Sequence, residues 1–297
     1  MNGEREDRAV FPFSYPAPGP IPLYEDETVD DLQRSGLRIL QKCGGLRFGE
    51  DAVLLAHHAA SLLRTRNKQV RVADIGCGSG ILLLLLASRL PQVRLTGIER
   101  VPSLAELASR NVRLNGLADR IRVVEGDIRD RHVPGESGFD LCISNPPYHM
   151  TGRGKPPADP VRAAATVSAT LTADDLAAAA RRLLRTHGTL VVSCRPAQLV
   201  DLMVACRGHG LEPKTLREVL PAPGRPASLL LMTAVAGGRA GGFSIATPLV
   251  VRDLHGTYTE EVQGIYTGEG IDPARLMDGL VRTAGTAPFP SDAGGLR

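Results

Sequence analysis

Short apolar runs with the length of buried strands recur through the middle of the chain, and segments with helical periodicity separate them. Strands are expected at 70–75, 93–99, 121–124, 139–144, 189–194, 215–220 and 228–235. Helices are expected at 51–63, 81–87, 103–115 and 172–185. Because strands and helices alternate, the pattern predicts an α/β fold, with a mostly parallel seven-stranded sheet that carries helices on both faces. The last two strands are expected to supply its antiparallel edge strand.

The two ends of the chain lack this pattern. Residues 1–27 are rich in proline and are expected to form a flexible arm. Residues 269–297 are expected to form a loosely ordered tail. The segment between them, residues 28–268, is expected to be a single domain.

Composition fits a globular cytoplasmic protein. Hydrophobic residues make up 43% of the chain, and the five cysteines show no metal-ligand spacing, so we expect reduced thiols and no metal. The first ten residues are too highly charged for a secretory signal, and the apolar run 81–87 is too short to span a bilayer. The formal charge of +3 is too small to indicate nucleic-acid binding by itself. We expect a monomer or weak dimer without membrane contact.

A glycine-rich loop follows the first strand, with the sequence Gly76, Cys77, Gly78, Ser79, Gly80. Glycines there permit positive φ and let the backbone approach a ligand closely. The spacing differs from the dinucleotide fingerprint G-x-G-x-x-G, because Ile81 occupies the last position. Asp74, two residues before the loop, suits a cationic ligand better than a pyrophosphate. A plain tight turn is the alternative.

Two further strands are followed by acidic residues. Glu99 ends the second strand, where a carboxylate can accept both hydroxyls of a ribose, unless it pairs with Arg100. Asp127 follows the third strand and can accept from an adenine amino group, with Ile128 against the ring. Open α/β sheets bind ligands at the carboxyl ends of their strands. We therefore expect these side chains to share one site with the glycine loop.

The fourth strand ends in Asn145, Pro146, Pro147 and Tyr148. Two prolines remove two backbone donors and forbid a helix, which leaves carbonyl oxygens without partners. Asn145 adds an acceptor and Tyr148 a flat face. Acceptors beside a stacking surface suit a planar group with an exocyclic NH2: adenine, cytosine, guanine or a glutamine amide. A tight turn after a core strand is the alternative.

With these motifs the chain resembles the class I S-adenosylmethionine-dependent methyltransferases that modify sp² amino nitrogens. It resembles most the bacterial tRNA (adenine-N6)-methyltransferase family that acts on valine tRNA. The similarity covers roughly residues 28–268 and is carried by segments 30–39, 47–56, 195–196, 224–227 and 258–262. It implies a Rossmann-like fold, S-adenosylmethionine (or its product S-adenosylhomocysteine) as cofactor, and methylation of adenine N6 in tRNA next to the anticodon. One departure is Thr166-Val167-Ser168, where the family carries an Arg-His-Glu-type cluster.

The expected site follows from the motifs and the resemblance together. The catalytic residues would be Asn145, Pro146, Pro147 and Tyr148. The cofactor would contact Arg47, Phe48, Asp51, Asp74, Gly76, Cys77, Gly78, Gly80, Glu99, Arg100, Asp127, Ile128 and Asn145. Phosphates of the RNA would contact Arg153, Lys155 and Arg162 in the Gly/Pro-rich loop after the catalytic turn, unless that loop is merely solvated. The alternatives are a protein-glutamine N5-methyltransferase, an rRNA guanine-N2 methyltransferase and a cofactor-binding module without catalysis.

Overall fold

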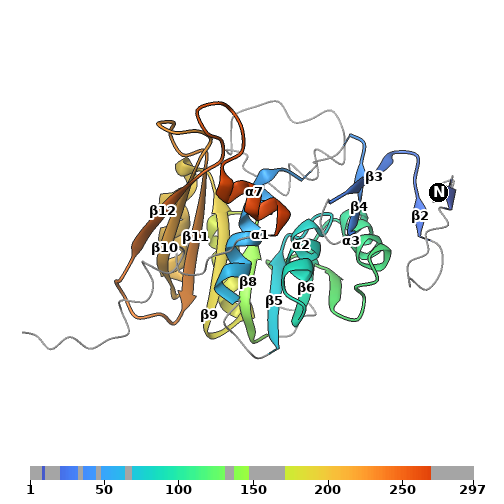
Figure 1. Cartoon of the computed structure of the whole chain (residues 1–297). Helices are drawn as coiled ribbons and strands as arrows, with labels where there is room; N and C mark the ends of the chain where they lie inside the picture. The colour runs from blue at the N-terminus through green and yellow to red at the C-terminus, as the bar shows by residue number, and fades with distance from the viewer. Residues whose placement is uncertain are drawn as a thin grey trace, which may run out of the picture.

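The structure, a computed structural model, describes residues 9–10, 21–32, 36–44, 48–63, 69–130, 137–146 and 171–268. Its main sheet has eight strands in the order β12-β10-β11-β9-β8-β5-β6-β7. Their bounds are β5 Val70–Ile75, β6 Val93–Glu99, β7 Ile121–Glu125, β8 Phe139–Ser144, β9 Leu184–Cys194, β10 Leu211–Leu220, β11 Leu229–Ala236 and β12 Ser244–Val250. Only β11 runs opposite to the other strands of this sheet. The mostly parallel α/β sheet is therefore confirmed (Figure 1).

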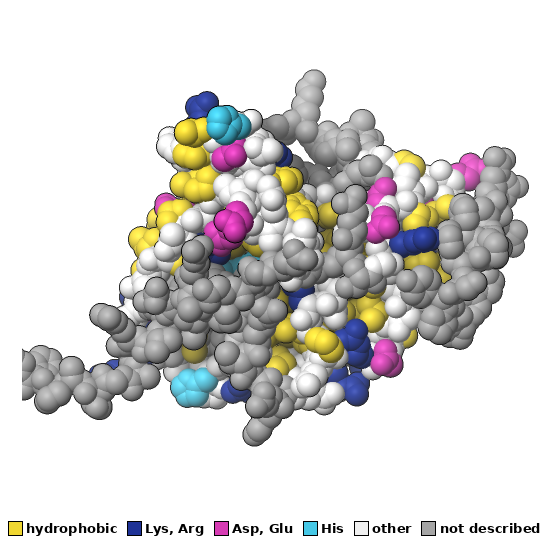
Figure 2. All heavy atoms as spheres, in the orientation of Figure 1, with side chains coloured by type: hydrophobic (Ala, Val, Ile, Leu, Met, Phe, Trp, Pro, Cys, Tyr) yellow, Lys and Arg dark blue, Asp and Glu magenta, His cyan; other side chains and the backbone are white. Residues whose placement is uncertain are grey.

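Two details of the predicted sheet are wrong. The described sheet has eight strands, and the antiparallel strand β11 lies inside it, between β9 and β10, and not at its edge. The pattern correctly indicated that β10 and β11 pair, but two paired strands can join a sheet in either order. Strand β12 was missed because only one of its seven residues is buried and three are exposed, including Ile245 at 65%, so it forms no apolar run. Figure 2 shows exposed hydrophobic side chains along this end of the sheet.

Helices cover both faces of the sheet, as predicted. They are α1 Glu50–Leu63, α2 Ile81–Arg89, α3 Pro102–Leu114, α5 Ala173–Leu183, α6 Leu199–Gly208 and α7 Glu260–Thr267, with a short 3-10 helix η2 at Pro196–Gln198. The first hydrophobic cluster joins one face to α1, α2, α3 and α7. The second joins the opposite face to α5 and α6. In Figure 1, α1 lies in front of the sheet.

The expected helix at 172–185 ends earlier than predicted. Thr172 caps it, because its hydroxyl accepts from the Asp175 backbone while the Asp175 carboxylate accepts from the Thr172 backbone. The helix stops at Leu183, and β9 begins at Leu184. Gly188 therefore lies within the strand, where an added Cβ would come within 2.9 Å of two backbone oxygens.

A hairpin packs on α3 through buried polar contacts. It consists of β3 Glu27–Asp31 and β4 Arg38–Lys42. The Glu27 carboxylate accepts from two Arg110 nitrogens at 2.6 and 2.7 Å, and both side chains are almost fully buried. The short strand β2 (Pro22–Leu23), which pairs with β1 (Ala9–Val10), is held in the same way, since Arg110 donates to the Pro22 carbonyl. Residues before the expected boundary at 28 thus contact the folded unit.

The hairpin is also tied to the glycine loop. Asn111 on α3 bonds to both backbone groups of Leu40 and donates to the Ser79 carbonyl at 2.9 Å. Asn111 therefore connects the glycine loop, through Ser79, to the hairpin, through Leu40. In the part of the chain that the structure describes, none of the helices is long and apolar enough to cross a membrane.

Candidate active site

The glycine loop turns tightly at the carboxyl end of β5. The backbone N–H groups of Gly76 and Cys77 donate to the Ile98 carbonyl at 2.9 and 3.1 Å, which anchors the loop to β6. Gly76 and Gly78 have φ of 75° and 56°, in the left-handed region that favours glycine. A Cβ at either position would have no heavy atom within 4 Å. The loop backbone is therefore open to close approach by a ligand.

Cys77 points away from that open side. Its side chain is only 4% exposed and belongs to the hydrophobic core, and burial raises the pKa of its thiol well above the usual value. A Cβ at Gly97 on β6 would lie 2.7 Å from the Cys77 sulfur. Gly97 thus allows the loop to pack against β6, a role that sequence reasoning missed. A glycine inside a strand is the available signal, because it often marks a close approach.

Asp74 is fully buried at the end of β5. Within the described residues, neither of its carboxyl oxygens has a hydrogen-bond partner. Burial, together with the nearby Glu99, raises the pKa of Asp74 well above its usual value. A buried polar group without a partner costs free energy. Asp74 is therefore suited to meet a donor or a cation supplied by a ligand.

Glu99 is held in one orientation by the backbone. One carboxylate oxygen accepts from the Gly78 N–H at 2.9 Å and the other from the Val101 N–H at 2.8 Å. A carboxylate can accept about four hydrogen bonds, so each oxygen retains acceptor capacity. The alternative pairing with Arg100 is not seen, since the Arg100 Nε lies 3.8 Å from an Asp127 oxygen instead.

Asp127 is ionised and paired. Arg129, two residues along the chain, donates to it from its backbone at 3.0 Å and from its guanidinium Nε at 2.9 Å. The Arg129 hydrogen bond lowers the pKa of Asp127 to about 2. Sequence reasoning missed this partner. An adenine amino group that binds Asp127 would therefore donate to a carboxylate that already contacts Arg100 and Arg129.

A cavity of about 90 Å³ brings most of the strand-end residues together. Six of the expected residues line it: Gly76, Glu99, Arg100, Asp127, Ile128 and Pro146. The sequence did not single out five others, Ile75, Ile98, Gly126, Arg129 and Leu171. Apolar side chains and ionised groups therefore share one cavity at the carboxyl edge of the sheet, as suits a nucleoside with a flat base and a polar sugar.

Asn145 follows β8 at the same edge. It is half-buried, and its side-chain oxygen accepts from the Ser193 hydroxyl at 2.6 Å. Ser193 lies on the neighbouring strand β9 and is fully buried. The preceding residue, Ser144, donates to the Ile75 carbonyl at 2.8 Å and so ties the end of β8 to β5. Pro147 and Tyr148 lie outside the described residues.

A sequence model of the family described as "Methyltransferase small domain" matches residues 52–203, which include the glycine loop, Glu99, Asp127 and Asn145. The chain belongs to this family. Relatives from Yersinia pseudotuberculosis serotype O:3 (strain YPIII) and Yersinia pestis (strain Pestoides F) are 32% identical over 217 residues. That alignment covers 73% of this chain and 82% and 84% of the two relatives. Both relatives are named tRNA1(Val) (adenine(37)-N6)-methyltransferase.

Solved structures agree with this assignment. A predicted O-methyltransferase from Agrobacterium tumefaciens is 26% identical, with a TM-score of 0.60 over 74% of this chain and 97% of its own. A Listeria monocytogenes protein described as a class I S-adenosylmethionine-dependent methyltransferase is 13% identical, with a TM-score of 0.53 over 76% of this chain and 74% of its own. The predicted class I fold is confirmed, and this protein is an S-adenosylmethionine-dependent methyltransferase.

Two further expected cofactor residues, Phe48 and Asp51, lie at the start of α1 of the methyltransferase. Asp51 is in the first turn of α1, and burial raises its pKa although Arg195 lies 3.7 Å away. Phe48 packs against the first hydrophobic cluster, and its backbone donates to the Gln41 side chain at 3.1 Å. Neither residue lines the cavity beside Glu99. Arg47, Arg153, Lys155, Arg162 and Thr166-Val167-Ser168 lie outside the described residues.

Proposed function

We propose that this protein transfers a methyl group from S-adenosylmethionine to the exocyclic N6 of an adenine in tRNA, next to the anticodon of a valine tRNA. The observation that carries the proposal is the position of Asn145. Its oriented side-chain oxygen follows β8 at the sheet edge where the cavity opens, and Pro146, the next residue, lines that cavity. An acceptor beside the cofactor is what an incoming amino group requires. The names of the 32% identical relatives support adenine and tRNA as the acceptor.

The residues around the cavity fit the cofactor. When bound, S-adenosylmethionine would supply an electrophilic methyl group. The Asp74 carboxyl group, which lacks a partner in the described part of the chain, would receive a donor of the cofactor's methionine part. Glu99 would accept the ribose hydroxyls with its remaining acceptor capacity, and the Asp127 carboxylate would accept from the adenine amino group. Ile128 and Leu171 would cover the cofactor's adenine ring.

At the target base, the chain orients and desolvates a weak nucleophile. The lone pair of an adenine amino group is delocalised into the ring. Hydrogen bonds from its two N–H groups to the Asn145 oxygen and the Pro146 carbonyl would favour a tetrahedral nitrogen and hold it in line. Tyr148 remains the predicted stacking surface, worth about 1–3 kcal/mol for one base. The base must leave its stack to reach this site.

The proposal is tested by the nucleoside that becomes methylated. The full chain is incubated with isotopically labelled S-adenosylmethionine and bulk tRNA, and the nucleosides are analysed by mass spectrometry. We expect labelled N6-methyladenosine in the valine tRNA. Label in a guanosine of rRNA, or in glutamine of a protein added in parallel, would replace the proposed substrate with one of the alternatives.

Ser193 is expected to position Asn145. Ser193→Ala removes the 2.6 Å hydrogen bond to the Asn145 oxygen, which then loses its fixed orientation. A neutral hydrogen bond contributes about 0.5–1.5 kcal/mol. The turnover number at saturating tRNA should therefore fall roughly 2- to 13-fold. Cofactor affinity, measured by calorimetry, should not change.

Thr233→Val is the matched control, because it removes a buried hydroxyl that bonds to Thr215 on the adjacent strand β10. Both variants should lose similar thermal stability, but only the Ser193 variant should lose turnover. An unchanged turnover number in Ser193→Ala would show that Asn145 needs no such support.

A further inference from the structure

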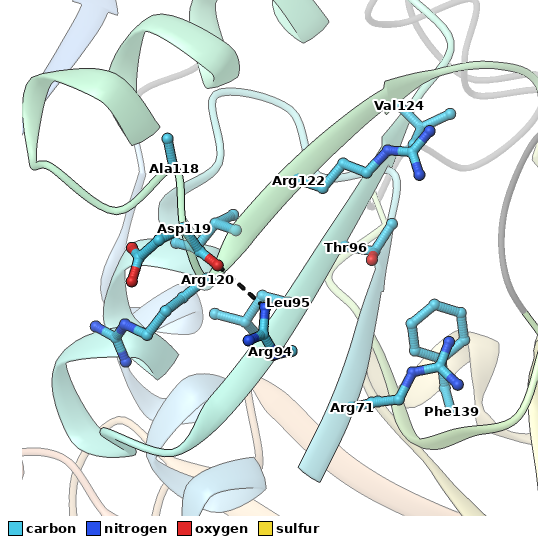
Figure 3. A pocket seen from close by; sticks show the side chains of 11 residues that line it. Arg71, Arg94, Leu95, Thr96, Ala118, Asp119, Arg120, Arg122, Val124 and Phe139 are labelled. Carbon is cyan, nitrogen blue, oxygen red and sulfur yellow. Dashed lines mark hydrogen bonds between the residues drawn. The ribbon is translucent and has the colours of Figure 1, made fainter. Parts of the chain in front are cut away.

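Three arginines form a row on one face of the sheet, at the amino ends of β5, β6 and β7. Arg71 pairs with Arg94 across β5 and β6, and Thr96 pairs with Arg122 across β6 and β7. Alternate residues of a strand share a face, so Arg94 and Thr96 point the same way. Arg71, Arg94 and Arg122 therefore project from the same face, with Thr96 between them (Figure 3). This end of the sheet is opposite to the one that carries the active site.

The row borders a cavity of about 180 Å³. On this face α5 packs on β5, β8 and β9, and α6 packs on β10. Among the described residues, no helix covers β6 and β7 on this side. Parallel strands are normally apolar on both faces because helices cover them. The exposed Arg94 and Arg122 instead keep this part of the sheet polar and open to solvent.

The charge of this cavity is positive. Asp119 is the only carboxylate that lines it in the described part of the chain, and Arg94 donates to the Asp119 backbone carbonyl at 3.1 Å, as Figure 3 shows. Within the described residues, Arg94 and Arg122 form no ion pair with an acidic side chain. The Arg71 guanidinium lies over the Phe139 ring, 4.9 Å from its centre. Guanidinium groups remain charged at any physiological pH.

We propose that this arginine row is a second RNA-binding surface, which holds phosphates of the tRNA at a distance from the modified base. Neighbouring strands are about 4.8 Å apart, and Arg122 lies two residues further along the sheet than Arg94, so the backbone of Arg94 is roughly 5 Å from that of Arg71 and roughly 8 Å from that of Arg122. Cations spread over this distance suit separate phosphates of a polynucleotide, whereas a single phosphate would need groups that converge on it. Each contacted phosphate strengthens binding by releasing counterions. The inference rests on the proposed tRNA substrate.

One RNA can occupy both places. A six-residue strand such as β5 is about 20 Å long, which sets the separation between the row and the glycine loop. One turn of a DNA helix covers about 34 Å, and one turn of an RNA helix is of the same order. A tRNA with one base in the active site is therefore long enough to reach the row.

The test compares two charge-matched double variants of the full chain. Arg94→Gln/Arg122→Gln removes two arginines of the row, and both are exposed, so the fold should persist. Arg113→Gln/Arg181→Gln removes two exposed arginines outside the row. Binding of valine tRNA is titrated by filter binding over a range of salt, with S-adenosylhomocysteine present. Methylation kinetics are measured in parallel.

We expect the row variant to bind tRNA roughly 2- to 30-fold more weakly, as for the loss of two exposed ion pairs. Its slope of log K against log salt should be shallower by about 1.5. The KM for tRNA should rise while kcat at saturating tRNA and cofactor affinity stay unchanged, because the row is remote from the cavity. Arg94→Glu/Arg122→Glu should bind more weakly still, and the control variant should match the parent.

Equal affinity and slope for the row variant and the parent, with the parent still methylating tRNA, would overturn this inference and leave the proposed function intact. If the parent neither binds nor methylates tRNA at low salt, the proposed function fails and the second RNA surface fails with it.

Discussion

Asn145→Ala should lower the single-turnover rate of methyl transfer strongly while leaving cofactor binding nearly intact. The Asn145 oxygen is oriented by Ser193, and the adjoining Pro146 lines the cavity, so we propose that this oxygen contacts the incoming amino group. That nitrogen gains positive charge as it attacks, and hydrogen bonds to charged groups contribute about 1.5–3 kcal/mol. The expected loss is roughly 10- to 150-fold. Because the interaction strengthens in the transition state, it should appear in the rate and not in ground-state affinity.

The measurement uses saturating valine tRNA and excess enzyme, with cofactor affinity determined by calorimetry. Asn115→Ala is a suitable control, because Asn115 bonds to the backbone of Arg38 in the hairpin and is remote from β8. It should lower thermal stability without a comparable loss of rate. A fall of less than tenfold for Asn145→Ala would remove Asn145 from the proposed mechanism.

The parts of the site that the sequence predicted are those fixed by local chain geometry. A glycine loop after β5 and an acid at the end of β6 must meet, because parallel strands end at the same edge of the sheet. The register between the strands confirms this, with Ile75 opposite Ile98. The order of the strands beyond β9 could not be predicted from the sequence in the same way. It depends on whether β10 or β11 joins β9, and most residues of both strands are buried.

The side chains that bind Asn145 and Asp127 could not be predicted from local sequence patterns. Ser193 and Asn145 are 48 residues apart, and their hydrogen bond depends on the register between β8 and β9. A serine inside an apolar strand is equally compatible with a small core residue. The Arg129–Asp127 pair was missed for a different reason. The sequence predicted only a ligand contact for Asp127, and it is the turn after β7 that brings Arg129 back onto the carboxylate.

The final expectation concerns Glu99 and the cofactor. Glu99→Ala should weaken the binding of S-adenosylhomocysteine by about 1–3 kcal/mol, because two ribose hydroxyls would lose their acceptor. This is roughly a 5- to 150-fold rise in Kd, measured by calorimetry. The substitution also frees the Gly78 and Val101 N–H groups that Glu99 now binds. A loss of affinity alone therefore does not identify the ribose contact.

A second ligand separates the two effects. A cofactor analogue that lacks both ribose hydroxyls has nothing to donate to Glu99, so the parent should bind it more weakly than S-adenosylhomocysteine. Glu99→Ala should then bind the analogue about as well as the parent does, since the lost contact is already absent. If the substitution instead weakens both ligands by the same factor, Glu99 acts by holding the glycine loop through Gly78 and not by binding the ribose.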